Sequence, residues 1–476
     1  MVFDVAVIGG GVIGGSILRE LSKYELSICM LEKENDVCMG ASKANSGIVH
    51  AGFDAAEGSL KAKFNVQGNI MMEEYASELG VKFIRNGSLV LAYSLEQLET
   101  LKELKLRGEK NGVKGLKIID KKELLQLEPN VSRSAIGALV APTGGIICPY
   151  GLTIAAIGNA MDNGAKLYTN FEVVKVVVGE DFINLFDSLG NAVSAKMVIN
   201  CAGLFGGKVA SLFGDDIEVK GRKGEYILLD KEVGGFVKST IFTTPTEKGK
   251  GILVSPTVDG NLILGPTAEQ IEDGVSRTTN KGLDEIKIKA AEMTENLPVL
   301  KAITSFAGIR AYTDKNDFII DRSAACDRLI NCIGIESPGL TASPAIARYV
   351  VETLVSKVLK LRRKATYEGR RKPFDYFSSL NLKEKNEMIK KDSSYGRVVC
   401  RCESVTEGEI LNALRQNPVA NDIDGVKRRT RAGMGRCQGG FCQIRVAEII
   451  AKERGVSLDK VTKKGGNSVL VKGKTK

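Results

Sequence analysis

One histidine stands alone in this chain. His50 is the only imidazole among 476 residues, and it lies in the segment SKANSGIVHAGFD. An imidazole changes its charge near neutral pH, so it could take a proton from a reacting hydroxyl group. A lone histidine is more often a structural residue than a catalytic one, and residue type alone therefore assigns His50 no role.

The first turn of the chain is rich in glycine. Gly9, Gly11 and Gly14 form the pattern G-x-G-x-x-G between the apolar run FDVAVI and the helical pattern VIGGSILRELSKY, and Glu32 ends the next strand-like segment, LSICMLE. Glycines at these positions let the backbone approach a pyrophosphate at a helix N-terminus. A carboxylate such as Glu32 can accept hydrogen bonds from ribose hydroxyls. The segment therefore predicts a dinucleotide cofactor rather than a bare glycine turn.

Three later segments favour FAD over NAD. ASKANSGIVHAGF, VINCAGLF and INCIGIESPGLTASPAIA each place small residues beside a strand end or a helix start. A cofactor that is contacted by such widely separated pieces of one chain is expected to be as extended as FAD. The residues predicted to contact it, besides those of the glycine turn and Glu32, are Ser42, Asn45, Ser46, Ala202, Gly203, Gly334, Gly339, Leu340 and Thr341.

Four of the ten cysteines are grouped near the C-terminus as C-x-C and C-x4-C, namely Cys400, Cys402, Cys437 and Cys442. Thiolates at these spacings can converge on a metal centre. Structural zinc usually uses C-x2-C pairs, which argues against zinc without excluding it. Disulfides are disfavoured in a reducing compartment. The pattern therefore predicts a metal site built from four thiolates.

The composition is that of a soluble globular protein, with 43% hydrophobic and 26% charged residues. No apolar run approaches the roughly 20 residues that span a bilayer, and the N-terminus shows no signal peptide, so the predicted location is cytoplasmic. The net charge of +10 favours anionic partners. Nucleic acid is not expected among them, because the basic run KRRTRAGMGR has no aromatic residue for base stacking and no recognition motif surrounds it.

Strand and helix patterns predict an α/β protein with two domains in its first three quarters. A Rossmann-like FAD-binding domain, a parallel sheet with a β-meander, is expected at residues 1–85, 150–220 and 325–360. An α+β substrate-binding domain with a mixed or antiparallel sheet is expected at 86–149 and 221–324. Within the second domain, the segment IIDKKELLQLEPN is expected to form one helix that proline closes.

The last quarter of the chain has a different character. A charged, partly helical linker is expected at residues 361–396, followed by a small helical metal-binding domain at 397–460 and a basic tail at 461–476. Thr406 and Glu409 have the spacing of a capping box, which predicts a helix that begins just after the first cysteine pair.

The stretch from residue 2 to about residue 357 resembles the FAD-dependent D-amino-acid-oxidase-like superfamily, and within it the glycerol-3-phosphate and L-2-hydroxyglutarate dehydrogenases. The motifs that carry the resemblance are DVAVIGGGVIGGSILREL, SKANSGIVHAGF, GSLKAKFNVQGN, AGIRAYTDKNDFIID and GIESPGLTASPAIA. It implies that His50 lies beside the flavin and accepts the hydroxyl proton, and that Arg310 binds the anionic group of the substrate. Tyr226 and Lys61 are weaker candidates for substrate contacts.

The C-terminal segment YGRVVCRCESVTEGEI…TRAGMGRCQGGFC resembles the BFD-like [2Fe–2S] domain that is fused to some flavin dehydrogenases. The resemblance implies that the four grouped cysteines hold a [2Fe–2S] cluster, with zinc as the alternative, and that the small domain is an iron–sulfur domain. Five arginines are expected to offset the negative charge of the cluster or to bind an acidic redox partner: Arg401, Arg428, Arg429, Arg431 and Arg436.

Together these features predict a dehydrogenase that transfers hydride from a small anionic hydroxy substrate to FAD and sends electrons through the cluster to a redox partner protein. The fused iron–sulfur domain favours sn-glycerol 3-phosphate, oxidised to dihydroxyacetone phosphate. L-2-hydroxyglutarate or another 2-hydroxy acid is the alternative, because Asp54 stands where glycerol-3-phosphate dehydrogenases carry an arginine. A non-catalytic electron-transfer subunit that retains FAD is an alternative of another class. A second flavoprotein subunit and a membrane-associated carrier, with peripheral membrane association, both stay open as acceptors.

Overall fold

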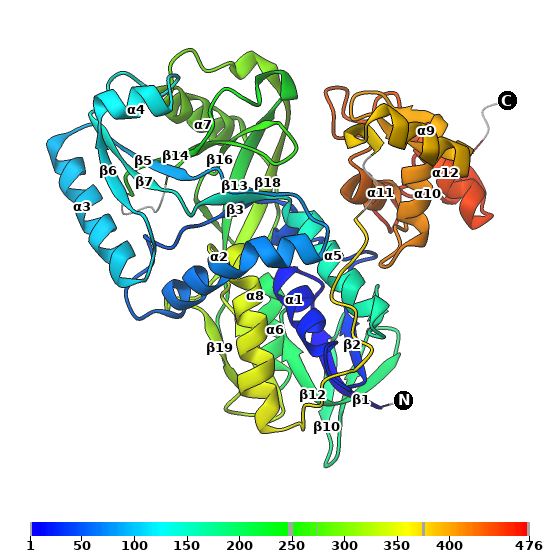
Figure 1. The fold of residues 1–476 in the computed structure, drawn as a ribbon. Helices are drawn as coiled ribbons and strands as arrows, with labels where there is room; N and C mark the ends of the chain where they lie inside the picture. The colour runs from blue at the N-terminus through cyan, green and yellow to red at the C-terminus, as the bar shows by residue number, and fades with distance from the viewer. Residues whose placement is uncertain (1, 246–250, 273, 374–376, 474–476) are drawn as a thin grey trace.

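Two lobes, each built around one large β-sheet, and a small helical body beside them make up the protein (Figure 1). The computed structural model describes residues 2–245, 251–272, 274–373 and 377–473. Residues 374–376 of the predicted linker and 474–476 of the predicted tail lie outside the described residues. The N-terminus begins in the lower lobe of Figure 1, and the chain ends in the helical body.

The first sheet has eight strands, most of them parallel. β1 (Val2–Ile8) lies between β2 (Ile28–Leu31) and β12 (Ala192–Asn200) and is parallel to both. β9 (Lys166–Tyr168) continues the parallel part beyond β2, and β20 (Leu329–Ile333) pairs in parallel with the end of β12. Because the carboxyl ends of parallel strands meet at one edge of a sheet, the turns after β1, β2 and β12 open on the same side.

The meander expected between residues 171 and 200 is present as β10 (Lys175–Val178), β11 (Ile183–Phe186) and the start of β12, which pair in succession as antiparallel neighbours. β19 (Ile319–Arg322) pairs antiparallel with β20 and so belongs to this first sheet. It falls inside the range 221–324 that we assigned to the second domain, so the chain returns to the first sheet a few residues before the expected boundary.

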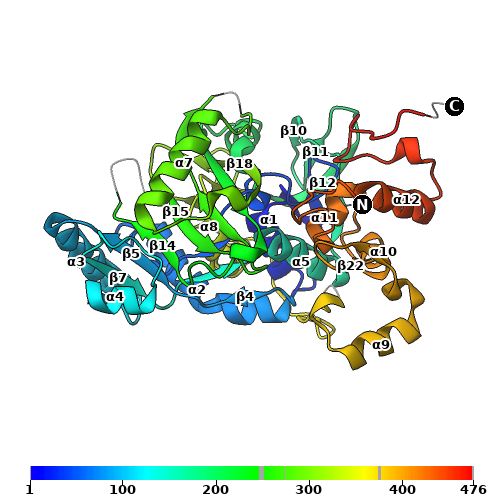
Figure 2. The same ribbon diagram turned by 90° about the horizontal axis from the view of Figure 1, so that it is seen from above.

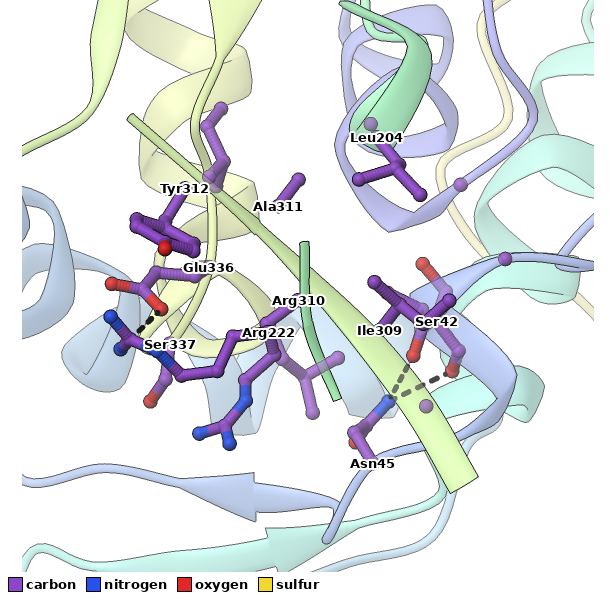
Figure 3. Close-up of a pocket in the computed structure, with 18 of the residues that line it drawn as sticks. Ser42, Asn45, Leu204, Arg222, Ile309, Arg310, Ala311, Tyr312, Glu336 and Ser337 are labelled. Atoms are coloured by element: carbon purple, nitrogen blue, oxygen red, sulfur yellow. Dashed lines mark hydrogen bonds and ion pairs between the residues drawn. The ribbon is translucent and has the colours of Figure 1, made fainter. Parts of the chain in front are cut away.

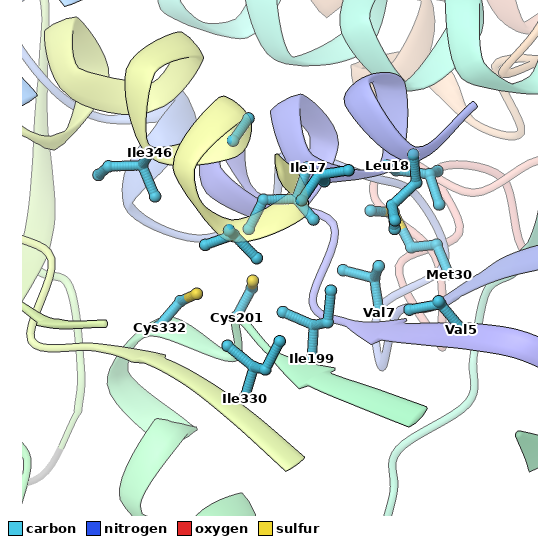
Figure 4. Packing of buried hydrophobic residues seen from close by; sticks show 14 of the residues in the cluster. Val5, Val7, Ile17, Leu18, Met30, Ile199, Cys201, Ile330, Cys332 and Ile346 are labelled. Carbon is cyan, nitrogen blue, oxygen red and sulfur yellow. The ribbon is translucent and has the colours of Figure 1, made fainter. Parts of the chain in front are cut away.

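Three helices cover one face of the first sheet: α1 (Val12–Leu21), α5 (Pro149–Asp162) and α8 (Gly339–Tyr349). Figure 4 shows Val7 and Ile199 of the sheet beneath Ile17 of α1 and Ile346 of α8, and all four side chains are completely buried. Burial of each such aliphatic side chain contributes roughly 1.5–3 kcal/mol. This packing fixes the start of α1, and with it the glycine turn that follows β1.

The second sheet has nine strands. In order they are β17 (Glu269–Ile271), β13 (Lys220–Leu229), β16 (Leu262–Gly265), β15 (Leu253–Pro256), β14 (Thr240–Thr243), β5 (Ser88–Ala92), β7 (Gly137–Ala141) and β6 (Lys117–Asp120), with β18 (Ala302–Tyr312) paired to β13. β5 and β14 are parallel, and the other pairs are antiparallel, so the sheet is mixed as expected. The helices that pack around it are α3 (Leu95–Lys110), α4 (Lys121–Leu127) and α7 (Asn280–Met293).

One helix of this lobe is shorter than the sequence suggested. Residues 118–120 of the segment IIDKKELLQLEPN pair with β7 as part of β6, and only the remainder forms α4. Asp120 separates the two elements, because its carboxylate accepts a hydrogen bond from the backbone N–H of Glu123 and caps α4. The β-branched pair Ile118 and Ile119 favours the strand.

Between the two lobes lie a three-stranded sheet and a long helix. The sheet comprises β3 (Ile48–Val49), β8 (Gly145–Ile147) and β4 (Phe83–Ile84), all antiparallel neighbours. The helix is α2 (Leu60–Glu78), which packs on α8. β3 leads directly into His50, so this connecting layer places the histidine between the lobes.

The C-terminal body is mostly helical. Its elements are α9 (Leu382–Lys391) in the predicted linker, then β21 (Val398–Cys400), β22 (Val405–Thr406), α10 (Glu407–Arg415), α11 (Ile423–Thr430) and α12 (Gln443–Arg454). The capping box is confirmed: the Thr406 side chain accepts from the Glu409 N–H, and the Glu409 carboxylate accepts from the Thr406 N–H at 2.8 Å. In Figure 2, α11 lies on the side of the first lobe and α12 lies farther out.

Candidate functional site

A cavity of about 1380 Å³ runs between the two lobes, from the glycine turn to β18. Drug-sized ligands usually occupy roughly 300–1,000 Å³, so this space suits a ligand as long as a dinucleotide together with a small second molecule. Of the predicted site residues, those that line it are Gly9, Gly11, Glu32, Ser42, Asn45, Ser46, His50, Lys61, Ala202, Gly203, Tyr226, Arg310, Gly339 and Leu340. The structure therefore brings most of them around one space.

Three predicted contacts lie behind the cavity wall instead. Gly14 sits in α1, where an added Cβ would collide with the carbonyl oxygen of Gly9. Gly334 has φ +69°, a left-handed conformation that glycine adopts without strain, and it packs against Thr313. Thr341 is completely buried, and its hydroxyl accepts a hydrogen bond from the backbone of His50. These residues shape the wall rather than face the cavity.

Glu32 is placed to receive ribose hydroxyls. One of its carboxylate oxygens accepts the N–H of Gly10 at 2.7 Å, and the other accepts the N–H of Glu34 at 2.9 Å. Each oxygen keeps a lone pair for a further donor. Burial raises the pKa of this carboxyl, and the two backbone donors oppose that rise. A buried acceptor at the edge of a cavity, next to a glycine turn, fits the adenosine ribose of FAD.

The loop after β2 is held in shape by its own polar side chains. The Ser42 hydroxyl accepts the N–H of Val12 at 2.9 Å and so caps the start of α1. Asn45 donates to the carbonyl oxygens of Ala41 and Ser42, each at 3.0 Å, and accepts the N–H of Gly47 at 2.8 Å (Figure 3). Ser42 and Asn45, both predicted cofactor contacts, thus also keep this loop at the N-terminus of α1.

His50 is fixed by hydrogen bonds on both sides of its peptide. Its N–H donates to the Thr341 hydroxyl at 2.9 Å, and its carbonyl oxygen accepts from the side-chain amides of Asn65 and Asn69, both at 3.0 Å. The ring nitrogen Nε2 lies 3.1 Å from the Ser337 hydroxyl. The backbone contacts fix the position of the residue, and the Ser337 contact fixes the ring. Nε2 therefore has a defined position, and a general base needs its accepting atom at a defined position.

Two arginines face each other across neighbouring strands at the far end of the cavity. Arg222 of β13 and Arg310 of β18 are directly paired in the antiparallel register, and both line the cavity (Figure 3). Like charges directly opposite each other destabilise a sheet, so this pair needs an anion or another compensation. The Arg310 Nη2 donates to the carbonyl oxygen of Thr267 at 3.0 Å, while its buried Nε has no hydrogen-bond partner among the described residues.

A carboxylate and a third cation complete this end of the cavity. The Glu336 carboxylate lies 3.0 Å from Lys61 Nζ and 3.6 Å from the guanidinium of Arg222. Arg222 also stacks over the ring of Tyr312, with its central carbon 4.4 Å from the ring centroid. The arrangement holds Arg222 and Lys61 beside Arg310, and it can bind the anionic group of a small molecule through several donors at once.

Tyr226 lines the same cavity but is mainly a packing residue. Its ring is 4% exposed and is stacked on Phe306, with ring centroids 4.9 Å apart. Burial raises the pKa of its phenol, and the positive charge of Arg310 opposes that rise. The phenol is therefore neutral near pH 7 and can act as a hydrogen-bonding group but not as a base.

Sequence reasoning missed Arg222, Glu336, Ser337 and the two asparagines that hold His50. A signal for Arg222 was present, because side chains two and four residues apart along a strand point to the same face. Arg222 therefore shares a face with Tyr226, which we had singled out. Gly224, between them, leaves room for Pro266, since an added Cβ would lie 2.9 Å from the Cβ of that residue.

The four grouped cysteines come together as two pairs. The sulfur atoms of Cys402 and Cys437 lie 3.7 Å apart, and the thiols of Cys400 and Cys442 contact each other directly. Two thiolates bound to one tetrahedral metal at about 2.3 Å are about 3.7 Å apart. No group of three or more His, Cys, Asp or Glu side chains in the described ranges is arranged around a single ion. The four thiols therefore lie close together as two pairs, and a [2Fe–2S] cluster is held by four cysteine thiolates.

Within each pair, one thiol is shifted towards the thiolate and the other towards the thiol. Contact with the Cys442 thiol lowers the pKa of Cys400 to about 6, against the opposing effect of burial, and the same contact raises the pKa of Cys442. The N–H groups of Phe441, Gly439 and Gly440 lower the pKa of Cys437, while the pKa of its neighbour Cys402 is raised. The thiolate is the form that binds a metal, so Cys400 and Cys437 are the two sulfurs most readily available to it.

The arginines near the cysteines behave differently from the expectation. Arg428 and Arg429 both donate to the carboxylate of Asp36, in the loop after β2, and Arg429 does so at 2.8 and 2.9 Å. Asp36 is 2% exposed. These two arginines therefore attach the C-terminal body to the first lobe and do not face a partner.

Two further arginines attach the same body to the second lobe. Arg431 lies 2.6 Å from the carboxylate of Asp259 and 2.7 Å from that of Glu403, and Arg436 lies 3.1 Å from Asp230. Arg431 also donates to the hydroxyl of Tyr150, the second residue of α5, at 3.0 Å. The fifth arginine of the group, Arg401, is exposed, and the described residues show no such bridge from it to either lobe.

Within the described ranges, no helix combines the length and the apolar character that a membrane crossing needs. Residues 4–353 match the family described as FAD dependent oxidoreductase, and residues 398–452 match the BFD-like [2Fe–2S] binding domain. These matches confirm the predicted combination of FAD and a [2Fe–2S] cluster, and with it the predicted fold class. The fit of the glycine turn, Glu32 and the paired cysteines agrees with both.

Three proteins are informative relatives. The glycerol 3-phosphate dehydrogenase of Caloramator mitchellensis is 47% identical over 476 residues, which covers 100% of this chain and 99% of the relative. The FAD-bound, dithionite-reduced L-alpha-glycerophosphate oxidase of Mycoplasma pneumoniae has a TM-score of 0.74 at 31% identity and covers 78% of this chain and 98% of its own. The mitochondrial L-2-hydroxyglutarate dehydrogenase of Nematostella vectensis is 27% identical, covering 74% of this chain and 90% of its own.

Proposed function

The chain belongs to the family of FAD dependent oxidoreductases, and from that premise we propose that it oxidises sn-glycerol 3-phosphate to dihydroxyacetone phosphate and delivers the electrons to a protein acceptor. The observation that carries the proposal is the pair Arg222 and Arg310 at the end of a cavity that also holds His50. The full-length similarity to a glycerol 3-phosphate dehydrogenase supports the choice of substrate.

The cationic end of the cavity suits a phosphate. Arg310 has a buried Nε without a protein partner, and Arg222 and Lys61 share Glu336. A guanidinium fork binds two oxygens of one phosphate, and two such forks with an ammonium group offer more donors than one carboxylate can accept. The anionic group would thereby hold the rest of a three-carbon substrate toward the centre of the cavity.

His50 is the proposed base. Its neutral imidazole would accept the hydroxyl proton of the substrate at Nε2, the nitrogen that the Ser337 hydroxyl now faces at 3.1 Å. Asn65, Asn69 and Thr341 hold its backbone, so the ring need not reorient when the proton arrives. The proton can later leave through the Ser337 hydroxyl.

Glu32, the glycine turn and the loop from Ser42 to Ser46 are the residues proposed to hold FAD, and Cys400, Cys402, Cys437 and Cys442 those proposed to hold the cluster. FAD supplies the acceptor for the hydride, and the cluster supplies a carrier for single electrons. The protein itself binds the anionic group of the substrate, places the substrate hydroxyl near His50 and keeps water from the reacting carbon.

A second substrate has one observation in its favour. Asp54 lines the cavity, and a carboxylate there would oppose a phosphate dianion more strongly than it opposes a carboxylate. L-2-hydroxyglutarate therefore stays the second candidate, although the L-2-hydroxyglutarate dehydrogenase is the more distant relative. The cytoplasmic location likewise stays a prediction from the sequence.

The test is anaerobic reduction of the bound flavin, followed by its absorbance. Glycerol 3-phosphate should bleach the flavin, whereas glycerol, which lacks the anion, should do so with a much lower second-order rate constant. L-2-hydroxyglutarate and lactate serve as the competing substrates. Faster bleaching by L-2-hydroxyglutarate than by glycerol 3-phosphate would make L-2-hydroxyglutarate the preferred substrate. If none of these compounds bleached the flavin, both proposed substrates would be refuted.

A further inference from the structure

One surface of the C-terminal body surrounds the outer edge of the cysteine site. We name it the cluster face and define it by Arg401, Cys402, Arg436, Phe441, Ile444 and Arg445, all of them exposed. These residues come from the two cysteine-bearing loops and from the first turn of α12. They are joined around the site, since Cys402 and Cys437 lie 3.7 Å apart and Arg436 precedes Cys437.

The cysteine pairs give the site an inner and an outer side. Cys400 and Cys442 are 2% and 3% exposed and pack in the apolar core of the domain with residues such as Val446. Cys402 is exposed and Cys437 is partly exposed. A metal held between these two pairs is therefore reached from outside along the Cys402–Cys437 edge.

An apolar side chain stands beside that edge. Phe441 is 89% exposed, although its own N–H donates to the sulfur of Cys437, and Ile444 is 48% exposed. Aromatic side chains in such positions are frequent anchors of protein interfaces, where burial of the ring contributes much of the binding energy. Within the described residues, the Phe441 ring is not part of the hydrophobic core of the C-terminal body.

The charge of the cluster face is positive. The side chains of Arg436 and Arg445 are 65% and 75% exposed, and Arg401 is exposed as well. Their neighbours Arg428, Arg429 and Arg431 point the other way and are neutralised by acidic groups of the two lobes. Arg436 already pairs with Asp230 at 3.1 Å, although most of its side chain is exposed. Arg445 has a weaker acidic neighbour, Glu448 at 3.5 Å, so Arg401 and Arg445 carry most of the outward positive charge.

We propose that the cluster face is the docking site of an acidic protein that carries a one-electron redox centre. Acidic groups on such a partner would pair with Arg401 and Arg445, and an apolar patch would cover Phe441 and Ile444. The inference deepens the proposed function, because it names the surface and the kind of acceptor. Oxidation of each hydroxyl group releases two electrons and two protons, so two acceptor molecules each take one electron and the protons pass to water.

The surface chemistry favours a protein over a membrane or a second copy of the chain. The exposed apolar area is two side chains on a loop and a helix start, and an interfacial helix would need a continuous apolar face. A second copy would bring its own positive cluster face against this one, and the like charges would repel. An acidic partner avoids both difficulties.

The experiment measures binding to the oxidised holoenzyme by surface plasmon resonance. A plant-type ferredoxin is the acidic probe, cytochrome c is the basic probe, and vesicles of phosphatidylserine and phosphatidylcholine are the membrane probe. The variants are Phe441→Ser and Arg445→Glu. The matched controls are Leu189→Ser and Arg363→Glu. Leu189 lies on the first lobe and is 83% exposed, and the Arg363 side chain is 73% exposed, with Glu352 at 3.9 Å as its weak acidic neighbour.

We expect the ferredoxin to bind more tightly than cytochrome c, with an affinity that falls as salt increases. Phe441→Ser and Arg445→Glu should each raise its Kd by about fivefold or more, the effect of an interface residue that contributes over 1 kcal/mol. The two controls should leave the Kd unchanged. Preference for cytochrome c, an unchanged Kd in both cluster-face variants, or Phe441-dependent binding to the vesicles or to a second copy would overturn the proposal.

A second readout separates this inference from the proposed substrate. Ferredoxin reduced with a limiting amount of dithionite is mixed with the oxidised enzyme, so that electrons pass from the low-potential ferredoxin to the enzyme and no hydroxy substrate is needed. The cluster-face variants should slow the reoxidation of limiting ferredoxin, while reduction of the enzyme by dithionite itself, a small donor that needs no docking, should keep its wild-type rate. A wrong substrate would leave this result intact, whereas a wrong docking surface would abolish the difference between variants and controls.

Discussion

One buried carboxylate joins two arginines of the C-terminal body to the first lobe. Asp36 is 2% exposed and accepts from the guanidinium groups of Arg428 and Arg429, whose side chains are 7% and 0% exposed. Asp36→Asn keeps the shape of the side chain but removes the carboxylate with which both buried guanidinium groups pair, so that Asp422 is the carboxylate left near Arg428. Breaking a buried ion pair by removal of one partner typically costs about 3–5 kcal/mol. Since each 1.4 kcal/mol is a factor of ten, the detached state should become about 10²–10³-fold more populated.

Hydrogen exchange of the native protein measures that population. In Asp36→Asn, amides of α11 and of the segment 35–38 should exchange about 10²–10³-fold faster under conditions where exchange reports the equilibrium of opening. The control is Asp284→Asn on α7, which loses only a surface pair with Lys287, worth 0–1 kcal/mol. Unchanged exchange of α11 in Asp36→Asn would show that apolar contacts, and not this ion pair, hold the body in place.

The same carboxylate gives the attachment a dependence on pH. Burial by itself would raise the pKa of Asp36, but the Arg429 and Arg428 guanidinium groups hold it below its usual value. A carboxyl whose pKa is lowered on folding stabilises the native state above its unfolded pKa, about 3.9, and that contribution is lost as pH falls through the lower, native pKa. The attachment in the wild type should therefore weaken below about pH 4. Asp36→Asn should lack this acid-dependent step.

The remaining predictions concern the active site and the cofactors. His50→Gln should slow flavin reduction at saturating substrate by about 10²–10⁴-fold while FAD stays bound, and stopped-flow spectra over pH 5–9 test this; an unaltered rate would make the residue structural. Arg310→Lys and Arg222→Gln should mainly raise KM, because the bidentate geometry is lost in ground and transition states alike, and a fall in kcat alone would contradict this. Glu32→Ala should lose roughly 1.5–3 kcal/mol of FAD affinity, so full occupancy after dialysis would argue against the ribose contact. Iron analysis of anaerobically prepared protein should find about two irons per chain and fewer in Cys402→Ser, and zinc without iron would exclude the cluster.

The sequence predicted well those parts of the site whose functional residues all lie within one short segment. The glycine turn, the strand before it and the helix after it are consecutive, so their geometry follows from local rules. The capping box at Thr406 and Glu409 is local for the same reason. The C-x-C and C-x4-C motifs are also local, but the pairs that meet in space, such as Cys402 and Cys437, are 35 positions apart and depend on the fold of the domain between them.

The parts that the sequence could not predict depend on the meeting of distant segments. Asp36 and Arg429 are 393 positions apart, and the run KRRTRAGMGR looks like a solvated basic surface. The exposure of these side chains cannot be read from such a run, because arginine is equally suited to a surface and to a buried ion pair. Only the docking of α11 on the loop after β2 shows that two of the five cations, Arg428 and Arg429, are internal.

At the cationic end of the cavity, the strand pattern predicts which side chains share a face but not which residues of the neighbouring strand lie opposite them. The period of two places Arg222, Gly224 and Tyr226 on one face of β13, and the sequence alone contains that information. It does not contain the register that sets Arg222 opposite Arg310, because a shift of one residue would turn every side chain of the strand to the other face. Gly224 makes room for the segment Pro266–Thr267, because an added Cβ would lie 2.9 Å from the Cβ of Pro266 and 3.3 Å from the carbonyl oxygen of Thr267. That same carbonyl oxygen accepts a hydrogen bond from Arg310 at 3.0 Å, so the place of the second guanidinium depends on a segment 43 positions away and cannot be read from the strand pattern alone.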